Sequence, residues 1–292
     1  MSIGDLGSIP DIINSTQSLL EIILEPRGLN AAIIEGHKQV LEKIINDDSI
    51  DNLSKIAFLS NYKKIVKEYK NCRSVVEKAL KNIKKDSDPN KVEEDWYSFF
   101  FDKVRLVSDE VLQTIWSQIL SGEINIPGSY SRSLLHTLSI MSTSQALLFS
   151  KLAQFCLKEY QLTSEGTPSS LVHPLVFIST NRDAYKRYGF TVNKLLELER
   201  IGLINCDFKD EFVFMKKKVF QTGNKIVEVH GDPNNKHLIK AGNLTLTADG
   251  QSLYRIIGEE YKQYSSEHLE HIITKFQLRN CEVLINGKRI SP

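Results

Sequence analysis

A regular apolar repeat between residues 61 and 85 constrains the fold of this chain more than any other feature. Apolar or aromatic side chains return every three or four residues, which is the period of one face of an α-helix. A helix of this length, about seven turns, exposes a long apolar stripe that a second helix must cover. The pattern therefore predicts a helical hairpin or coiled-coil packing. The stripe consists of Tyr62, Ile65, Tyr69, Cys72, Val76, Leu80 and Ile83.

Two further helices are expected before this repeat. Residues 8–28 form one apolar segment that ends at a proline and a glycine, and residues 29–47 form a second. Residues 84–91 are polar, contain a proline and lack periodicity, which indicates a linker. The prediction for residues 1–88 is a helical hairpin or coiled-coil-like region that self-associates or docks onto a protein partner.

A central helical block is predicted for residues 89–160. Its first helix is rich in aromatic residues and directs Trp96, Phe99 and Phe100 toward a core. The stretch 115–142 that follows is the most distinctive of the chain. Two interpretations of it are open, a ligand site or a joint between two helices.

As a ligand site, the stretch 115–142 would present Glu123, Ser129 and Ser131 at a helix N-terminus, where backbone N–H groups favour anions. As a joint, its glycines and proline would turn the chain and a serine would cap the next helix. We favour the joint, because every one of these residues has a backbone reason to be there.

The sequence changes in character at about residue 161. A helix is expected from Thr191 to a glycine, Gly202, and another helix opens at Thr247. Helices followed by strands and then a further helix resemble a winged helix-turn-helix. The expected fold is thus mainly α, with a smaller α+β, winged-helix-like region over residues 161–292. The strand candidates are residues 171–179, 203–208, 211–220, 225–230 and 237–247.

The middle of the chain carries the pattern of a family. An acidic helix start precedes a tryptophan-containing apolar helix, a Gly-Glu-Ile turn, Pro-Gly-Ser with an aromatic residue, and a Leu-rich helix. This pattern resembles the uncharacterised bacterial family called domain of unknown function 2806, for which no catalytic residues are known. The matching positions are Asp109, Glu110, Trp116, Gly122, Glu123, Ile124, Pro127, Gly128, Ser129, Tyr130, Ser131 and Leu134.

A more distant likeness, to the abortive-infection alpha-type proteins, implies an accessory role in bacterial defence against phage. This implication rests on the likeness alone.

A basic and aromatic cluster suggests nucleic-acid contact in the winged-helix-like region. Lysines and arginines next to tyrosines suit phosphate contact, and the helix that begins after Thr191 would be the reading helix. The alternative is a protein-interaction module, because Glu197 and Glu199 on the same helix would repel phosphate. The candidate contacts are Arg182, Tyr185, Lys186, Arg187, Asn193, Lys194, Lys216, Lys217 and Lys218.

The helix at 61–85 is also strongly basic. It carries eight lysines and Arg73 against Glu68 and Glu77. Such a helix binds nucleic acid or an anionic membrane, or presents a solvated face. Only one arginine accompanies the eight lysines, and arginine is the usual groove reader, which favours the solvated face.

The composition excludes several other classes. The 292 residues carry 37 Lys and Arg against 36 Asp and Glu, which argues against a nucleic-acid-binding charge over the whole chain. No basic leader and no run of eighteen apolar residues occurs, so we expect neither a secretory signal nor a membrane span. The four cysteines are far apart, which predicts no disulfide framework and a cytoplasmic location.

Catalysis finds little support in the sequence. There is no phosphate-binding or dinucleotide motif, no nucleophile elbow and no H-E-x-x-H. His268 and His271 share a helix face without a third ligand. We therefore expect no cofactor, no metal and no catalytic residue. The chain is predicted to be a non-enzymatic interaction or adaptor protein in anti-phage defence that contacts DNA or RNA. The alternative is a metal-dependent nuclease or other toxic effector whose site is not recognised.

Overall fold

The structure is a computed structural model of the 292-residue chain. It divides into two compact units, Met1–Ser139 and Ile140–Pro292, each described here by itself. The division predicted from the sequence, with boundaries at 88/89 and 160/161, stays a prediction. The residues that the structure describes are 23–24, 31–165, 168–176, 186, 188–206, 211–214, 217–222, 224–232, 234, 237–240, 244–257, 269–270, 273–274, 277 and 281–290.

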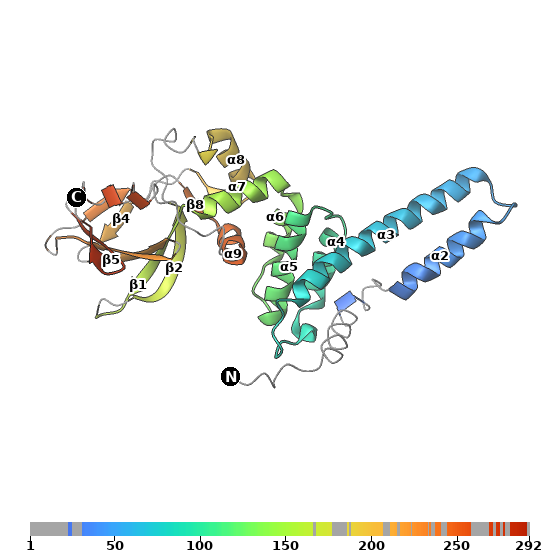
Figure 1. The fold of residues 1–292 in the computed structure, drawn as a ribbon, viewed down its shortest axis with the longest axis horizontal. Coiled ribbons are helices and arrows are strands. Elements are labelled where there is room, and N and C mark those ends of the chain that lie inside the picture. Colours follow the sequence, from blue (N-terminus) through green and yellow to red (C-terminus); the bar gives the residue numbers. More distant parts are fainter. Residues whose placement is uncertain are drawn as a thin grey trace. The chain divides into compact units, whose positions relative to one another are not determined.

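The first unit contains a helical hairpin formed by α2 (Ala31–Ile45) and α3 (Asn52–Leu80), which run side by side in Figure 1. Asp51 begins α3, because its side chain accepts a hydrogen bond from the Ser54 backbone N–H. The predicted apolar repeat lies within this helix of 29 residues as far as Leu80, whereas Ile83 lies beyond the helix end. Most of the first predicted helix, residues 8–28, lies outside the described residues.

The two halves of α3 differ in what they bury. Residues 52–68 contain no fully buried side chain and pack against α2, whose only buried residue is Leu41. The second half is buried against α5 (Glu110–Asn125). It contributes Tyr69, Asn71, Cys72, Val75, Val76 and Ala79 to the core.

An aromatic cluster forms the centre of this first unit. On α4 (Glu94–Val104), the rings of Trp96 and Phe100 stack with centroids 5.1 Å apart, and Phe100 meets Trp116 of α5 edge-on at 5.3 Å. Trp96 and Phe100 are buried as predicted, whereas Phe99 is only half-buried. Tyr97 and Phe101 complete the buried face in its place.

The segment predicted as a linker, residues 84–91, includes the short helix η2 (Pro89–Lys91). It packs against the end of α5, where the Asn125 side-chain oxygen accepts hydrogen bonds from the Lys84 backbone N–H and the Ser87 hydroxyl. After α5 the chain turns into α6 (Arg132–Ile140).

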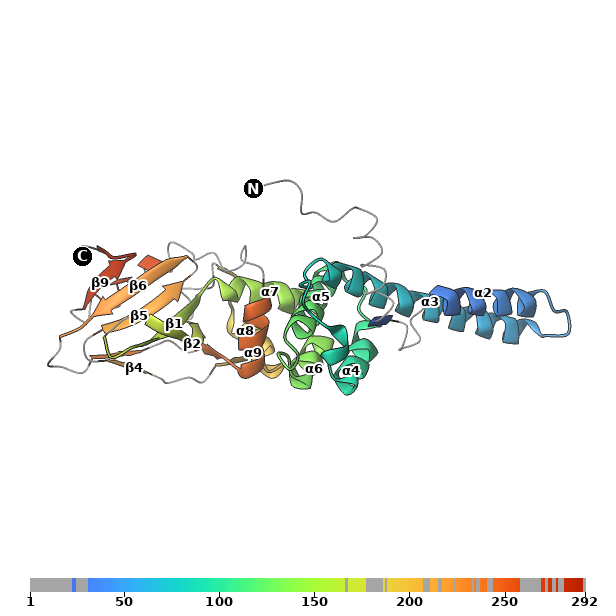
Figure 2. The same cartoon turned by 90° about the horizontal axis from the view of Figure 1, so that it is seen from below.

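The second unit contains α7 (Thr143–Ala153), which starts at a capping box formed by Ser142 and Gln145. An antiparallel sheet follows, with its strands in the order β10-β9-β6-β5-β1-β2-β8-β3 (Figure 2). β4 and β7 form a separate pair. The strands are β1 (Cys156–Leu162), β2 (Pro168–Val176), β3 (Ile204–Asn205), β4 (Glu211–Phe214), β5 (Lys217–Thr222), β6 (Lys225–His230), β7 (His237–Lys240), β8 (Leu244–Leu246), β9 (Glu282–Ile285) and β10 (Lys288–Arg289).

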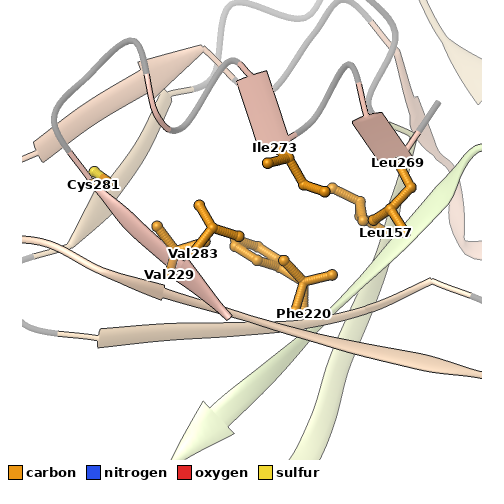
Figure 3. Packing of buried hydrophobic residues seen from close by; sticks show 8 residues of the cluster. Leu157, Phe220, Val229, Leu269, Ile273, Cys281 and Val283 are labelled. Atoms are coloured by element: carbon orange, nitrogen blue, oxygen red, sulfur yellow. The ribbon is translucent and has the colours of Figure 1, made fainter. Parts of the chain in front are cut away.

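The described part of the chain is therefore mainly helical, with its antiparallel sheet in the C-terminal part, as the sequence predicted. Three strands lie outside the predicted candidates: β1, which falls at the end of the region predicted to be a helical block, and β9 and β10 near the end of the chain. The side chains of β5, β6 and β9 pack together on one face of the sheet (Figure 3). The cluster consists of Leu157, Phe220, Val227, Val229, Leu269, Ile273, Cys281 and Val283.

The helix α8 (Val192–Arg200) leads into β3, which pairs with β8, and β8 leads into α9 (Ala248–Ile256). The predicted caps are present: Thr191 accepts from the Lys194 backbone N–H, and Thr247 from the Gly250 N–H. Gly202 has a φ of 82°, as expected of a glycine after a helix. The Thr247 hydroxyl also donates to the Gly202 carbonyl at 2.5 Å, which fastens the start of α9 to the end of α8.

In the described part of the chain, no helix has the length and apolar character that a membrane span requires.

Candidate nucleic-acid interface

The nine predicted contact residues divide into three groups. Four of them, Arg182, Tyr185, Arg187 and Lys216, lie outside the described residues. A second group lies at or near the start of α8 and comprises Lys186, Asn193 and Lys194. The third group, Lys217 and Lys218, lies on β5.

The first turn of α8 is open to solvent. Asn193 and Lys194 are both exposed there, while Leu195 and Leu198 anchor the opposite face of the helix in the core. Lys186 is exposed as well, and its carbonyl accepts from the Gly189 N–H at 2.8 Å. The start of α8 thus offers an amide and an ammonium group next to the positive end of the helix dipole, an arrangement that suits an anion.

The outer face of α8 also exposes two apolar side chains, Val192 and Leu196. This pair was not predicted, although its i, i+4 spacing on the side away from the two buried leucines could have revealed it. Glu197 is exposed on the same helix, whereas the Glu199 carboxylate accepts a hydrogen bond from the Cys206 backbone N–H at 2.7 Å. One of the two acids expected to repel phosphate is therefore engaged within the unit.

The two lysines of β5 are held by ion pairs inside the sheet. Lys217 Nζ lies 2.6 Å from a carboxylate oxygen of Glu228 on β6, and Lys218 pairs with Glu159 on β1. The hydrogen bond from Lys217 is the main cause that lowers the pKa of the Glu228 carboxyl, with a further contribution from His230. These lysines already neutralise strand carboxylates, so we remove them from the set of nucleic-acid contacts.

The stretch 115–142 forms a joint whose polar groups bond to one another. Glu123 is only 2% exposed, and its two carboxylate oxygens accept from the Gly128 N–H at 2.5 Å and the Tyr130 N–H at 2.9 Å. The Tyr130 carbonyl in turn accepts from the Trp96 indole N–H at 2.7 Å. A buried carboxylate is tolerated here because two backbone donors satisfy it.

The two serines proposed for a ligand site also have partners within the joint. The Ser129 hydroxyl donates to the Ile126 carbonyl at 2.5 Å, and the Ser131 hydroxyl accepts from the Leu134 N–H at 3.1 Å, which caps α6. Glu123 and both serines thus perform the turning and capping roles expected of a joint.

All four cysteines of the chain are buried. Burial raises the pKa of the Cys72 thiol to about 12, which keeps it protonated and unreactive at neutral pH. Among the residues that the structure describes, no three His, Cys, Asp or Glu side chains gather as a metal site would require. His268 and His271 lie outside those residues.

These elements define a class of protein: a helical unit built on a hairpin, joined to a unit of an antiparallel sheet with flanking helices. A family model described as "Protein of unknown function (DUF2806)" matches residues 61–270, which is more than half of the chain. The chain belongs to this family, as its sequence motifs suggested. Neither the search of curated proteins nor the search of solved structures gave a match.

The buried carboxylate of the joint gives a stability prediction. In Glu123→Gln one of the two acceptor oxygens becomes an NH₂ group, which cannot accept from a backbone N–H. We expect a loss of about 1–3 kcal/mol in the free energy of unfolding, the cost of a buried donor without a partner, measured by chemical denaturation.

The matched control is Glu110→Gln, which removes the exposed ion pair between Glu110 and Lys78 and should cost less than about 1 kcal/mol. Equal losses in the two variants would show that the Glu123 carboxylate does not hold the joint.

Proposed function

We propose that this chain is a cytoplasmic, non-enzymatic interaction protein that contacts nucleic acid through the start of α8 and self-associates through the α2–α3 hairpin. The observation that carries the nucleic-acid contact is the solvent-exposed first turn of α8, with Asn193 and Lys194 at its positive end. Reading helices of helix-turn-helix proteins use the same N-terminal positions to reach the DNA.

The order of elements around α8 supports a winged-helix-like fold for this region. α8 is followed by β3, β3 pairs with β8, and β8 in turn pairs with β2. A helix that feeds a small antiparallel sheet is the arrangement expected of a winged helix. The strands β4 to β7 stand between β3 and β8 in the sequence, so the segment in the place of the wing is longer than a simple hairpin.

The hairpin supports self-association because it exposes an apolar surface. Isolated exposed side chains are ordinary, but a group of them marks an interaction site. The same region, residues 31–58, contains five acids and three lysines, so two copies meet without a strong charge of one sign. The hairpin surface consists of Ile33, Val40, Ile45, Leu53, Ile56 and Phe58.

The proposed setting is defence against phage. It rests only on the likeness of the helical block to abortive-infection alpha-type proteins, and the family match does not bear on it.

The α8 contact predicts the behaviour of Lys186→Glu combined with Lys194→Glu. Loss of two phosphate contacts should lower affinity for a 30-base-pair DNA or RNA duplex and reduce the slope of log K against log salt by about 1.8, at about 0.9 per contact. Glutamate is favourable in the first turn of a helix, so Lys194→Glu should leave α8 intact. Fluorescence anisotropy over a salt series measures both effects.

The charge-matched control is Lys151→Glu with Lys288→Glu, two exposed lysines of the same unit. An equal loss of affinity and slope in this control would show that the effect comes from net charge and not from a contact at α8. Cleavage of the duplex that needs Mg²⁺ and stops with EDTA would support the nuclease alternative instead. Binding to a protein but not to nucleic acid would assign the outer face of α8, with Val192 and Leu196, to a protein partner.

Self-association predicts that Leu53→Gln combined with Ile56→Gln converts the protein to a monomer, because these two side chains are 77% and 62% exposed on the hairpin. Sedimentation equilibrium measures the mass. The control is Leu106→Gln with Ile126→Gln, at 64% and 63% exposure elsewhere in the same unit. A wild-type protein that is already monomeric at high concentration would contradict this part of the proposal.

A further inference from the structure

A row of lysines runs along the outer side of α3. Lys63, Lys67, Lys70 and Lys81 are separated by four, three and eleven residues, and spacings of three and four keep side chains on one line of a helix. All four are exposed. We call these four residues the lysine row.

The lysine row lies away from the buried face of α3. In the second half of the helix that face is formed by Cys72, Val75, Val76 and Ala79, and α5 covers it. Successive residues turn by about 100°, so Lys70 and Lys81 project well away from the line of these buried positions. The four lysine side chains therefore project to solvent, while Ser74, which lies on the same line between Lys70 and Lys81, bonds to Gln113 of α5.

The acids of α3 do not neutralise the row. Glu68 pairs with Arg105 at 3.0 Å and lies 4.0 Å from Lys64, and Glu77 pairs with Arg73 at 2.6 Å. Among the ion pairs between described residues, none includes a lysine of the row. In the part of the chain that the structure describes, these four ammonium groups thus form no ion pair, and Glu77, which lies on the same line, is paired with Arg73.

Their spacing fits a polyanion. The eighteen residues from Lys63 to Lys81 span about 27 Å of helix, at 1.5 Å per residue. A nucleic-acid duplex presents one phosphate charge per about 1.7 Å of its axis, so several phosphates lie within reach of the four flexible side chains. Neutralising them releases counterions, which favours binding.

Lysine side chains favour contact with the phosphate backbone over contact with base edges. A lysine ammonium is a point charge, without the planar fork with which arginine reads guanine. An acidic protein helix would need apolar side chains along the line, and an anionic membrane would need an apolar face beside the charges. Between Lys63 and Lys81 the line continues only through Lys67, Lys70, Ser74 and Glu77, which meets neither need. The exposed apolar side chains of α3, Leu53, Ile56 and Phe58, lie before Lys63 and belong to the hairpin surface.

We propose that the lysine row binds the phosphate backbone of a nucleic-acid duplex without regard to sequence. This inference deepens the proposed function and rests on it, because it adds a second contact, in the other compact unit, to the one at α8. The sequence favoured a solvated face for the whole helix. Among the described residues, Arg73 and Lys78 are held by ion pairs, whereas the lysines of the row are not, and this difference distinguishes the row from the rest of the basic helix.

The test compares the full chain with the variant Lys63→Gln, Lys67→Gln, Lys70→Gln on a 30-base-pair duplex and on a shuffled sequence. Three lost contacts should reduce the slope of log K against log salt by about 2.7 on both duplexes, at about 0.9 per contact. Glutamine has nearly the helix propensity of lysine, so the circular dichroism spectrum should not change. Replacing the same three lysines by arginine should retain the wild-type slope.

The matched control is Lys38→Gln, Lys43→Gln, Lys64→Gln, which removes the same charge from other faces of the hairpin. A slope that falls equally in this control overturns the row as a site, and so does a row variant that binds like the wild type.

The two contacts fail in distinguishable ways. If the row variant keeps the wild-type slope while Lys186→Glu with Lys194→Glu loses it, the row is wrong and the α8 contact stands; the reverse result refutes α8 and keeps the row. A wild-type protein that binds neither duplex overturns both. Loss of binding in the row variant only to phosphatidylserine vesicles would overturn the nucleic-acid assignment in favour of a membrane. Loss of binding only to polyglutamate would overturn it in favour of an acidic protein.

Discussion

The packing of α3 against α5 is the constraint on which the first unit depends. Only the second half of α3 is buried by this contact, and polar side chains hold it in register. The Ser74 hydroxyl and the Lys78 ammonium both donate to the Gln113 side-chain oxygen, at 2.8 and 3.1 Å, and the Asn71 amide donates to the Arg105 carbonyl at 2.8 Å. The first half of the same helix then has α2 as its main neighbour. One rigid helix therefore serves as part of a core and as the support of two exposed surfaces, the hairpin surface and the lysine row.

The joint between α5 and α6 is held by hydrogen bonds from buried polar side chains to the backbone of the turn. The Glu123 carboxylate accepts from the backbone N–H groups of Gly128 and Tyr130, and the Trp96 indole donates to the Tyr130 carbonyl. The Tyr130 ring also lies so close to Gly122 that a Cβ added at this glycine would come within 2.6 Å of the ring. The motif that most clearly marks the family is thus explained by architecture. The surfaces proposed for function lie elsewhere, on α3 and α8.

The predictions that rest on local chemistry agree with the structure. Thr191 and Thr247 cap helices as expected, because a cap involves only residues within one turn. The inner stripe of α3 follows its sequence period, since Tyr69, Cys72 and Val76 are buried. The period failed at Ile83, which was expected in the stripe and lies beyond the end of α3.

Features that depend on distant parts of the chain could not be predicted. β1 exists because Cys156–Leu162 pairs with β2 and β5, and its own sequence has no clear alternation. Lys217 and Lys218 looked like contacts for nucleic acid, but they form ion pairs with Glu228 and Glu159 on the two neighbouring strands. Charge in a sequence does not reveal which cations are already neutralised, and this distinction decides where nucleic acid can bind.

The most direct test of the whole account is the reactivity of each lysine toward acetylation, followed by mass spectrometry with and without a bound duplex. The account predicts that Lys63, Lys67, Lys70 and Lys194 are protected by the duplex, while Lys217 and Lys218 show the same reactivity in both states because of their ion pairs. Equal reactivity of the first four lysines with and without saturating duplex, or protection centred on Lys217 and Lys218, would contradict it.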